Sequence, residues 1–129
     1  MNLINSKDHG LHSLAFDYLQ KAGLISYQID SIEGLGFYDA PASKGHHLAY
    51  AGGLMEHSIN VVDNLLELNV FEDEESAYRV GMLHDLVKCQ CYRMKEDGTF
   101  EYVQPPYLGH GVASVLIAHE IGISLTPVE

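Results

Sequence analysis

The sequence predicts a mainly α-helical fold with one small β-hairpin, at about residues 91–103. Apolar residues recur with helical spacing along most of the chain, whereas "CYRMKEDGTFEYV" has two short β-prone runs around a turn pair. The chain has 129 residues, 47% of them hydrophobic and 19% charged, which is typical of a folded protein with a single core. We therefore expect one domain over residues 1–129, without an internal repeat or linker.

Two helices are predicted before the first loop. The first spans residues 6–22, where apolar side chains share one stripe and Gly23 follows at a position where helices commonly stop. A shorter helical stretch is expected around residues 25–32. The segment "GLGFYDAPASKGHH", residues 34–47, then has the glycines and proline of a loop.

Two further helices are predicted in the middle of the chain. One covers residues 54–68, with two glycines just before it. The next begins after Asp73, which can cap it, carries acidic residues in its first turn, and continues through Val87.

After Val87 the pattern changes. The pair Asp97 and Gly98 marks the turn of the hairpin. The segment "QPPYLGH" is a loop, and a last helix is expected over residues 110–121, closed by Gly122.

Charge argues against a long nucleic acid as a partner. The chain has 7 Lys and Arg against 18 Asp and Glu, a formal net charge of −11, which repels a phosphate backbone. A small nucleotide in a metal-lined cleft is still compatible with this charge. Eight histidines are a high count for so short a chain and give the first hint of a metal.

Cysteine content predicts a reducing, cytoplasmic setting. Cys89 and Cys91 are too few for a disulfide framework, and their spacing disfavours a bond between them. No apolar run reaches the roughly 20 residues that span a bilayer, so no membrane partner is expected.

Two histidines are predicted to face inward from different helices. His57 shares a helical row with Leu54, Val61, Leu65 and Leu68, and His84 shares one with Ala77, Val80 and Val87. Asp85 follows His84 directly in "MLHDLVK", although adjacent helical residues point about 100° apart. Each histidine is either a hydrogen-bonded core residue or a metal ligand, and spacing alone leaves both readings open.

Three motifs carry a family resemblance. The ordered set "GGLMEHS", "LHDLVK" and "YLGHG" resembles the HD-domain superfamily of metal-dependent phosphohydrolases, in particular its small bacterial and phage members. The resemblance implies an HD-domain-like bundle of α-helices. It also implies that His57, His84 and Asp85 bind a divalent metal ion, namely Mn, Fe, Co, Ni, Zn or Mg.

The resemblance assigns three more residues to the site. Lys88 matches the lysine that meets substrate phosphate; the alternative is a lysine extending to solvent at a helix end. His110 matches the histidine of L-G-H-G and would serve a second metal or the phosphate, or else lie in a loop or at a helix cap. His47 would reach the mouth of the pocket and contact substrate.

The other histidines are expected to play no part in the chemistry. His9, His12 and His46 are interpreted as surface residues. His119 shares a row with Val112, Leu116 and Ile123 and is interpreted as a packed core histidine.

The implied activity is a phosphohydrolase acting through metal-activated water on a nucleotide or another small phosphate ester or phosphodiester. Asp85 would bridge two metals or accept the proton of the water, and Lys88 and His110 would stabilise developing charge.

One departure from the family favours an alternative. Its members take a further metal-binding aspartate from a later helix, yet the only aspartate after Asp85 is Asp97, in the hairpin turn. The alternative is a catalytically impaired HD domain that binds a nucleotide or a protein partner.

The end of the sequence predicts self-association. The chain stops at "SLTPVE", where related sequences enter another helix, so the domain is expected to lack a final helix. Ile123, Leu125 and Val128 would then have no later element to cover them. We expect a homodimer with the C-terminal region at or near the contact.

Overall fold

The mainly α-helical fold and its small hairpin are confirmed. A computed structural model describes residues 3–42, 50–97, 100–102, 110–123, 125 and 129. These residues form five α-helices, a 3₁₀-helix and two strands, in the order α1 (Leu3–Lys21), α2 (Ser26–Gly34), α3 (Gly53–Glu67), α4 (Glu74–Leu83), η1 (Leu86–Gln90), β1 (Tyr92–Met94), β2 (Phe100–Tyr102) and α5 (His110–Glu120).

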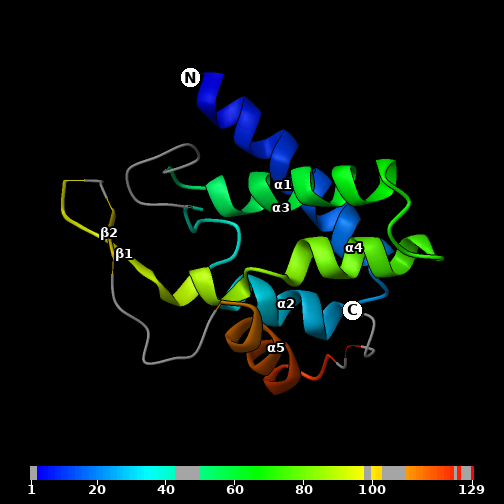
Figure 1. The fold of residues 1–129 in the computed structure, drawn as a ribbon. Helices are drawn as coiled ribbons and strands as arrows, with labels where there is room; N and C mark the ends of the chain where they lie inside the picture. The colour runs from blue at the N-terminus through cyan, green and yellow to red at the C-terminus, as the bar shows by residue number, and fades with distance from the viewer. Residues whose placement is uncertain (1–2, 43–49, 98–99, 103–109, 124, 126–128) are drawn as a thin grey trace.

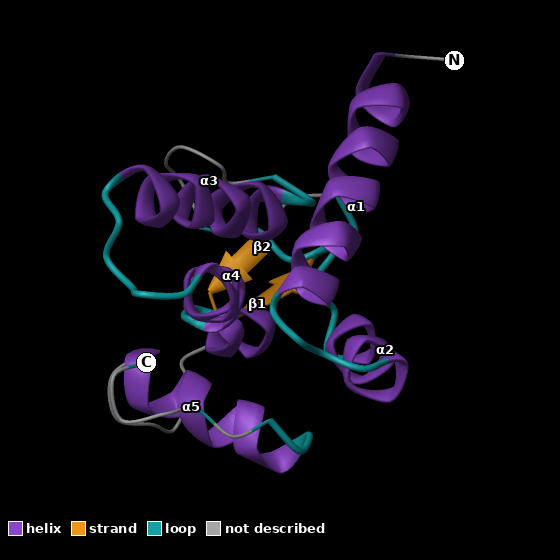
Figure 2. Ribbon diagram, turned by 90° about the vertical axis from the view of Figure 1, so that its right-hand side faces the viewer, coloured by secondary structure: helices purple, strands orange, loops and turns teal. Residues whose placement is uncertain are grey.

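Helix α4 is the central element of the bundle. It packs against α3, α1 and α5, and α1 also packs on α3. Figure 2 views α4 nearly end-on, with α3 above it, α5 below it and α1 to one side. The hairpin of β1 and β2 projects from the helices beyond η1 (Figure 1). Side chains from all five α-helices and from η1 meet in one hydrophobic core.

Local signals set the starts of α3 and α4 as predicted. Gly52, with φ of 89°, occupies a left-handed conformation that favours glycine and stands at the N-cap of α3. The Asp73 carboxylate accepts a hydrogen bond of 2.7 Å from the backbone N–H of Ser76 and caps α4. The first helix begins at Leu3, three residues earlier than expected.

A glycine brings α3 and α4 into close contact. A Cβ atom on Gly81 would lie 2.9 Å from the backbone N and Cα of Val62 and would overlap the Val62 side chain. No residue with a side chain fits there without movement of one helix. Gly81 therefore sets the separation of the two helices.

The predicted apolar row on α3 was partly wrong. The buried side of this helix contains Leu54, Met55, Ser58, Ile59 and Val62, whereas Leu68, at the far end of the predicted row, is 73% exposed. His57 consequently lies at the edge of the buried side and is only partly covered. Its side chain is 32% exposed.

Two predictions near the C-terminus were also wrong. His119 is exposed, because α5 turns Ile117 and Ala118 toward the core and leaves His119 on its outer side. Ile123 was expected to lack cover, but it is 4% exposed, and Leu125 packs against the same core. Val128 lies outside the described residues.

The hairpin pairs antiparallel, with Tyr92 opposite Tyr102 and Met94 opposite Phe100. Both strands fall inside the predicted range of residues 91–103. In the part of the chain that the structure describes, no helix is long and apolar enough to cross a membrane.

Candidate metal centre

A break in the helix lets His84 and Asp85 converge. Helix α4 ends at Leu83, and Asp85, with φ of −119° and ψ of 27°, leaves the helical conformation before η1 begins at Leu86. The expectation of one helix through Val87 was therefore wrong. Because the backbone turns at Asp85, the two neighbouring side chains no longer diverge, and His84 Nε2 lies 3.1 Å from Asp85 Oδ2.

Helix α3 supplies the third member of the cluster. His57 Nε2 lies 3.4 Å from Asp85 Oδ2, and the rings of His57 and His84 have centroids 5.2 Å apart. One ligand atom from each of the three residues lies within 4.8 Å of the other two. We define His57, His84 and Asp85 as the metal cluster.

The imidazole of His84 is oriented by the backbone of its own helix. Its Nδ1–H donates a hydrogen bond of 2.9 Å to the carbonyl oxygen of Gly81. This bond directs Nε2 toward the cluster and leaves it available as a ligand.

The spacing of these atoms fits a divalent first-row ion. Protein nitrogen and oxygen atoms bind such ions at about 2.0–2.2 Å, so two ligands of one ion lie about 2.8–3.6 Å apart at octahedral or tetrahedral angles. The separations of 3.1 and 3.4 Å in the cluster fall in this range. Two imidazole nitrogens and one carboxylate oxygen are also a donor set that these ions accept.

The comparison with protein families agrees with this geometry. Residues 54–127, which include the metal cluster, match the sequence model of the HD domain. The chain belongs to the HD domain family. The resemblance noted in the three motifs is thereby confirmed.

One curated relative of this HD domain is the dihydroneopterin 2′,3′-cyclic phosphate phosphodiesterase of Methanocaldococcus jannaschii. The two sequences are 35% identical over 85 residues, which cover 60% of this chain and 34% of the relative. The chain thus spans about a third of that relative's length. No solved structure matches the chain significantly.

Lys88 adds a positive charge to the metal cluster of this HD domain. Its Nζ lies 3.3 Å from Asp85 Oδ2, and its side chain is mostly buried. Burial opposes ionisation of Asp85, but the hydrogen bond from His84 and the charges of His84 and Lys88 outweigh it and hold the pKa of Asp85 well below its ordinary value. Asp85 is therefore an anion at neutral pH.

The two imidazoles of the HD domain titrate differently. Burial, with the nearby charge of His84, lowers the pKa of His57. Burial also opposes protonation of His84, but its hydrogen bond to Asp85 prevails and raises its pKa. A proton therefore competes with a metal ion more strongly at His84 than at His57.

Metal affinity should therefore depend on pH. The pKa of His84 is raised above 6.5, the ordinary histidine value. Its proton therefore competes with the metal at a higher pH than the proton of an ordinary histidine would. We expect affinity to fall by up to about tenfold per pH unit as the pH is lowered toward and below 6.5. Titration of the metal-free protein with Zn²⁺ at several pH values measures this. A constant affinity over that range would contradict it.

For most of the other histidines, the side chains lie outside the described residues. His110 begins α5, but its side chain lies outside the described residues, as do His46, His47 and the side chain of His9. His12 is exposed as expected, with its ring centroid 3.9 Å from that of Tyr38.

Gly81 was not singled out from the sequence, although it sets the separation of α3 and α4. The available signal was a glycine inside a helix, three residues before His84.

Proposed function

We propose that this HD domain is a metal-dependent phosphohydrolase that cleaves small phosphodiesters, including those of nucleotides. The observation that carries the proposal is the convergence of His57, His84 and Asp85 from two separate elements. The name of the relative, a cyclic phosphate phosphodiesterase, supports a diester over a monoester. The net charge of −11 supports a small substrate over long RNA or DNA.

Each residue of the site has a separate task in this proposal. A divalent ion, when bound, supplies a lowered pKa for water and positive charge for the phosphate oxygens. Asp85, held as an anion, would bind the ion with its negative charge. The ammonium of Lys88, beside Asp85, pairs with a non-bridging phosphate oxygen.

A substrate panel tests the proposal. The purified chain, loaded separately with Mn²⁺, Co²⁺, Ni²⁺, Zn²⁺ or Mg²⁺, is assayed with bis(p-nitrophenyl) phosphate, p-nitrophenyl phosphate and 2′,3′-cyclic nucleotides. We expect metal-dependent turnover, faster on the diesters. Absence of turnover in protein shown to contain the metal would contradict it.

A specific observation keeps the binding function as a second candidate. The metal cluster contains three candidate ligands among the described residues, and Asp97, the one later aspartate in the sequence, lies in the exposed turn of the hairpin. A catalytically impaired domain would bind a cyclic nucleotide saturably, in a metal-dependent manner, without hydrolysing it. Calorimetry alongside the turnover assay separates the two functions.

Lys88→Ala should impair substrate use without removing the metal. Since Lys88 is proposed to pair with phosphate, we expect kcat/KM to fall by about 10- to 100-fold, the equivalent of one charge-assisted hydrogen bond. Metal content should remain at the parent level. Lys21→Ala, which removes an exposed lysine paired with Asp17, is the matched control. An unchanged kcat/KM would show that Lys88 does not contact the phosphate.

Four further assignments stay predictions. They are a role for His110 in binding a second metal or the phosphate, contact of His47 with substrate, a single HD-like domain over residues 1–129, and a cytoplasmic setting.

The homodimer is also still a prediction. Sedimentation at micromolar concentration should give twice the chain mass of 14.3 kDa. A monomer would contradict it.

A further inference from the structure

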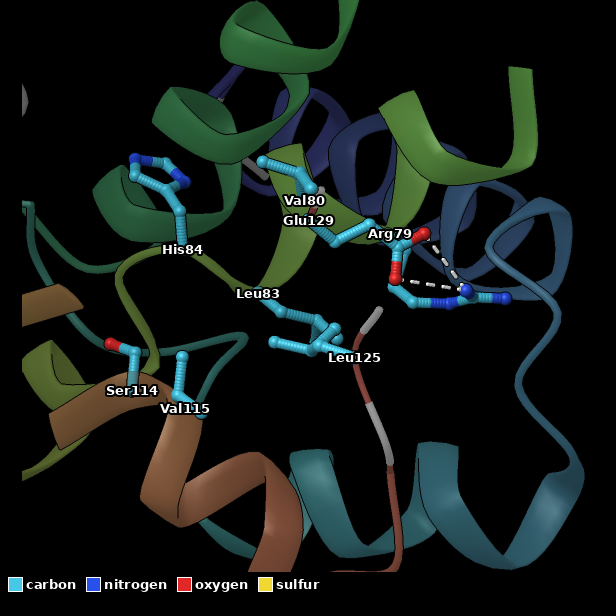
Figure 3. Close-up of a pocket in the computed structure, with 8 residues that line it drawn as sticks. All are labelled: Arg79, Val80, Leu83, His84, Ser114, Val115, Leu125 and Glu129. Carbon is cyan, nitrogen blue, oxygen red and sulfur yellow. Dashed lines mark hydrogen bonds and ion pairs between the residues drawn. The ribbon is translucent and has the colours of Figure 1, made fainter. Parts of the chain in front are cut away.

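A pocket of about 240 Å³ lies beside the metal cluster, between α4, α5 and the residues that follow α5. Four aliphatic side chains form its walls: Val80, Leu83, Val115 and Leu125. Figure 3 shows these side chains coming from both helices and from the segment after α5. The pocket therefore offers an apolar surface to whatever enters it.

The pocket and the metal cluster share one residue. His84 lines one side of the pocket, and Arg79 with Glu129 lines the opposite side (Figure 3). Since Nε2 of His84 belongs to the metal cluster, the pocket and the cluster are adjacent.

Charge at the far side disfavours an anion. The Arg79 guanidinium is held by Glu129, at 2.9 and 3.2 Å, and also by Glu75, and its Nε–H donates to the carbonyl of Ala22. Of these partners, only Glu129 lines the pocket with Arg79, and its carboxylate balances the guanidinium charge. The guanidinium already donates to Glu129, Glu75 and Ala22, so this end of the pocket offers little positive charge to a ligand. A second phosphate or a carboxylate would therefore have to compete with Glu129 for Arg79.

Size limits what the pocket can hold. Sites that take up a complete drug-sized ligand have volumes of roughly 300–1,000 Å³. At about 240 Å³ this pocket accommodates part of a substrate, such as one ring system, while the phosphate remains outside. An apolar wall with a few polar groups at its rim suits a flat, uncharged ring.

We propose that this pocket binds the uncharged, ring-bearing organic group of the phosphodiester, so that the preferred substrate carries its negative charge only at the phosphate bound by the metal. The proposal rests on the proposed function for its substrate, but occupancy of the pocket by a ring can be measured without catalysis.

A pair of adjacent tryptophan variants tests the pocket. Val115 and Leu116 are similarly exposed, at 49% and 53%, and are neighbours on α5, but only Val115 lines the pocket. Val115→Trp should fill the pocket from its open side without disturbing the core. Leu116→Trp adds the same bulk outside it and is the matched control.

The first readout is binding of small probes followed by methyl NMR, without metal or substrate. Benzyl alcohol at millimolar concentration should shift the methyl signals of Val80, Leu83 and Leu125 in the parent and in Leu116→Trp, but not in Val115→Trp. Benzoate, which has the same ring and a negative charge, should shift them less. No shift with benzyl alcohol, an equal effect of benzoate, or equal behaviour of the two variants would overturn the proposal.

The second readout distinguishes binding of the ring in the pocket from hydrolysis of the phosphodiester. Val115→Trp should raise KM for a 2′,3′-cyclic nucleotide by about tenfold. It should leave turnover of ethylene phosphate, a cyclic diester without a base, at the parent level. Equal losses on both substrates would overturn the role of the pocket. Lack of turnover in the parent, with benzyl alcohol still bound, would instead count against the proposed function.

Discussion

Asp85→Asn should remove the metal and the phosphohydrolase activity together. Asp85 Oδ2 is within 3.1–3.4 Å of both histidines, and an amide has no negative charge with which to bind the ion. Loss of groups that merely support a ligand costs about 10- to 100-fold in metal affinity, so loss of a ligand should cost more than about 100-fold. Metal analysis after dialysis and kcat/KM on the best diester measure the two effects.

An aspartate elsewhere provides the control for this substitution. Asp30→Asn makes the same chemical change on the exposed surface of α2 and should keep parent metal content and activity. Circular dichroism of both variants checks that they fold. Parent metal content in folded Asp85→Asn would show that Asp85 is no ligand.

Gly81→Ala should both destabilise the fold and weaken the metal site. The added Cβ would overlap Val62 and force α3 and α4 apart. Overpacking of this kind typically costs about 1–3 kcal/mol of unfolding free energy. Because His57 lies on α3 and His84 at the end of α4, the same displacement should lower metal affinity. Denaturant unfolding and metal titration measure the two consequences.

Gly10→Ala is the control for Gly81→Ala. Gly10 also lies within an α-helix, but nothing is found within 4 Å of an added Cβ there. This change should stabilise the protein by about 0.5–1 kcal/mol and leave metal affinity unchanged. If Gly81→Ala left both stability and metal affinity at parent levels, the close contact between α3 and α4 would be contradicted.

Local sequence signals predicted most of the helices. The cap at Asp73, the glycine before α3 and the helical spacing of apolar residues act over a few residues, so they can be interpreted without knowledge of the fold. The inward histidines were also identified from spacing, although the exposure of Leu68 shows that spacing located the buried side of α3 only approximately.

The break that forms the metal cluster could not be predicted from the local sequence. No glycine or proline separates His84 from Val87, and the spacing favours an uninterrupted helix. In the structure the backbone N–H of Val87 donates to the buried Ser114 hydroxyl of α5, at 3.0 Å. This hydrogen bond joins two residues that are far apart in the sequence, so the spacing of apolar residues around His84 does not reveal it.

The most direct test of the metal centre is the position of the ion itself. Crystals of the Mn²⁺-loaded protein, measured at a wavelength where manganese scatters anomalously, should show one strong peak among His57 Nε2, His84 Nε2 and Asp85 Oδ2, about 2.0–2.2 Å from each. A map without a peak at this place, with the three side chains still bonded to one another, would contradict the metal centre and the function proposed from it.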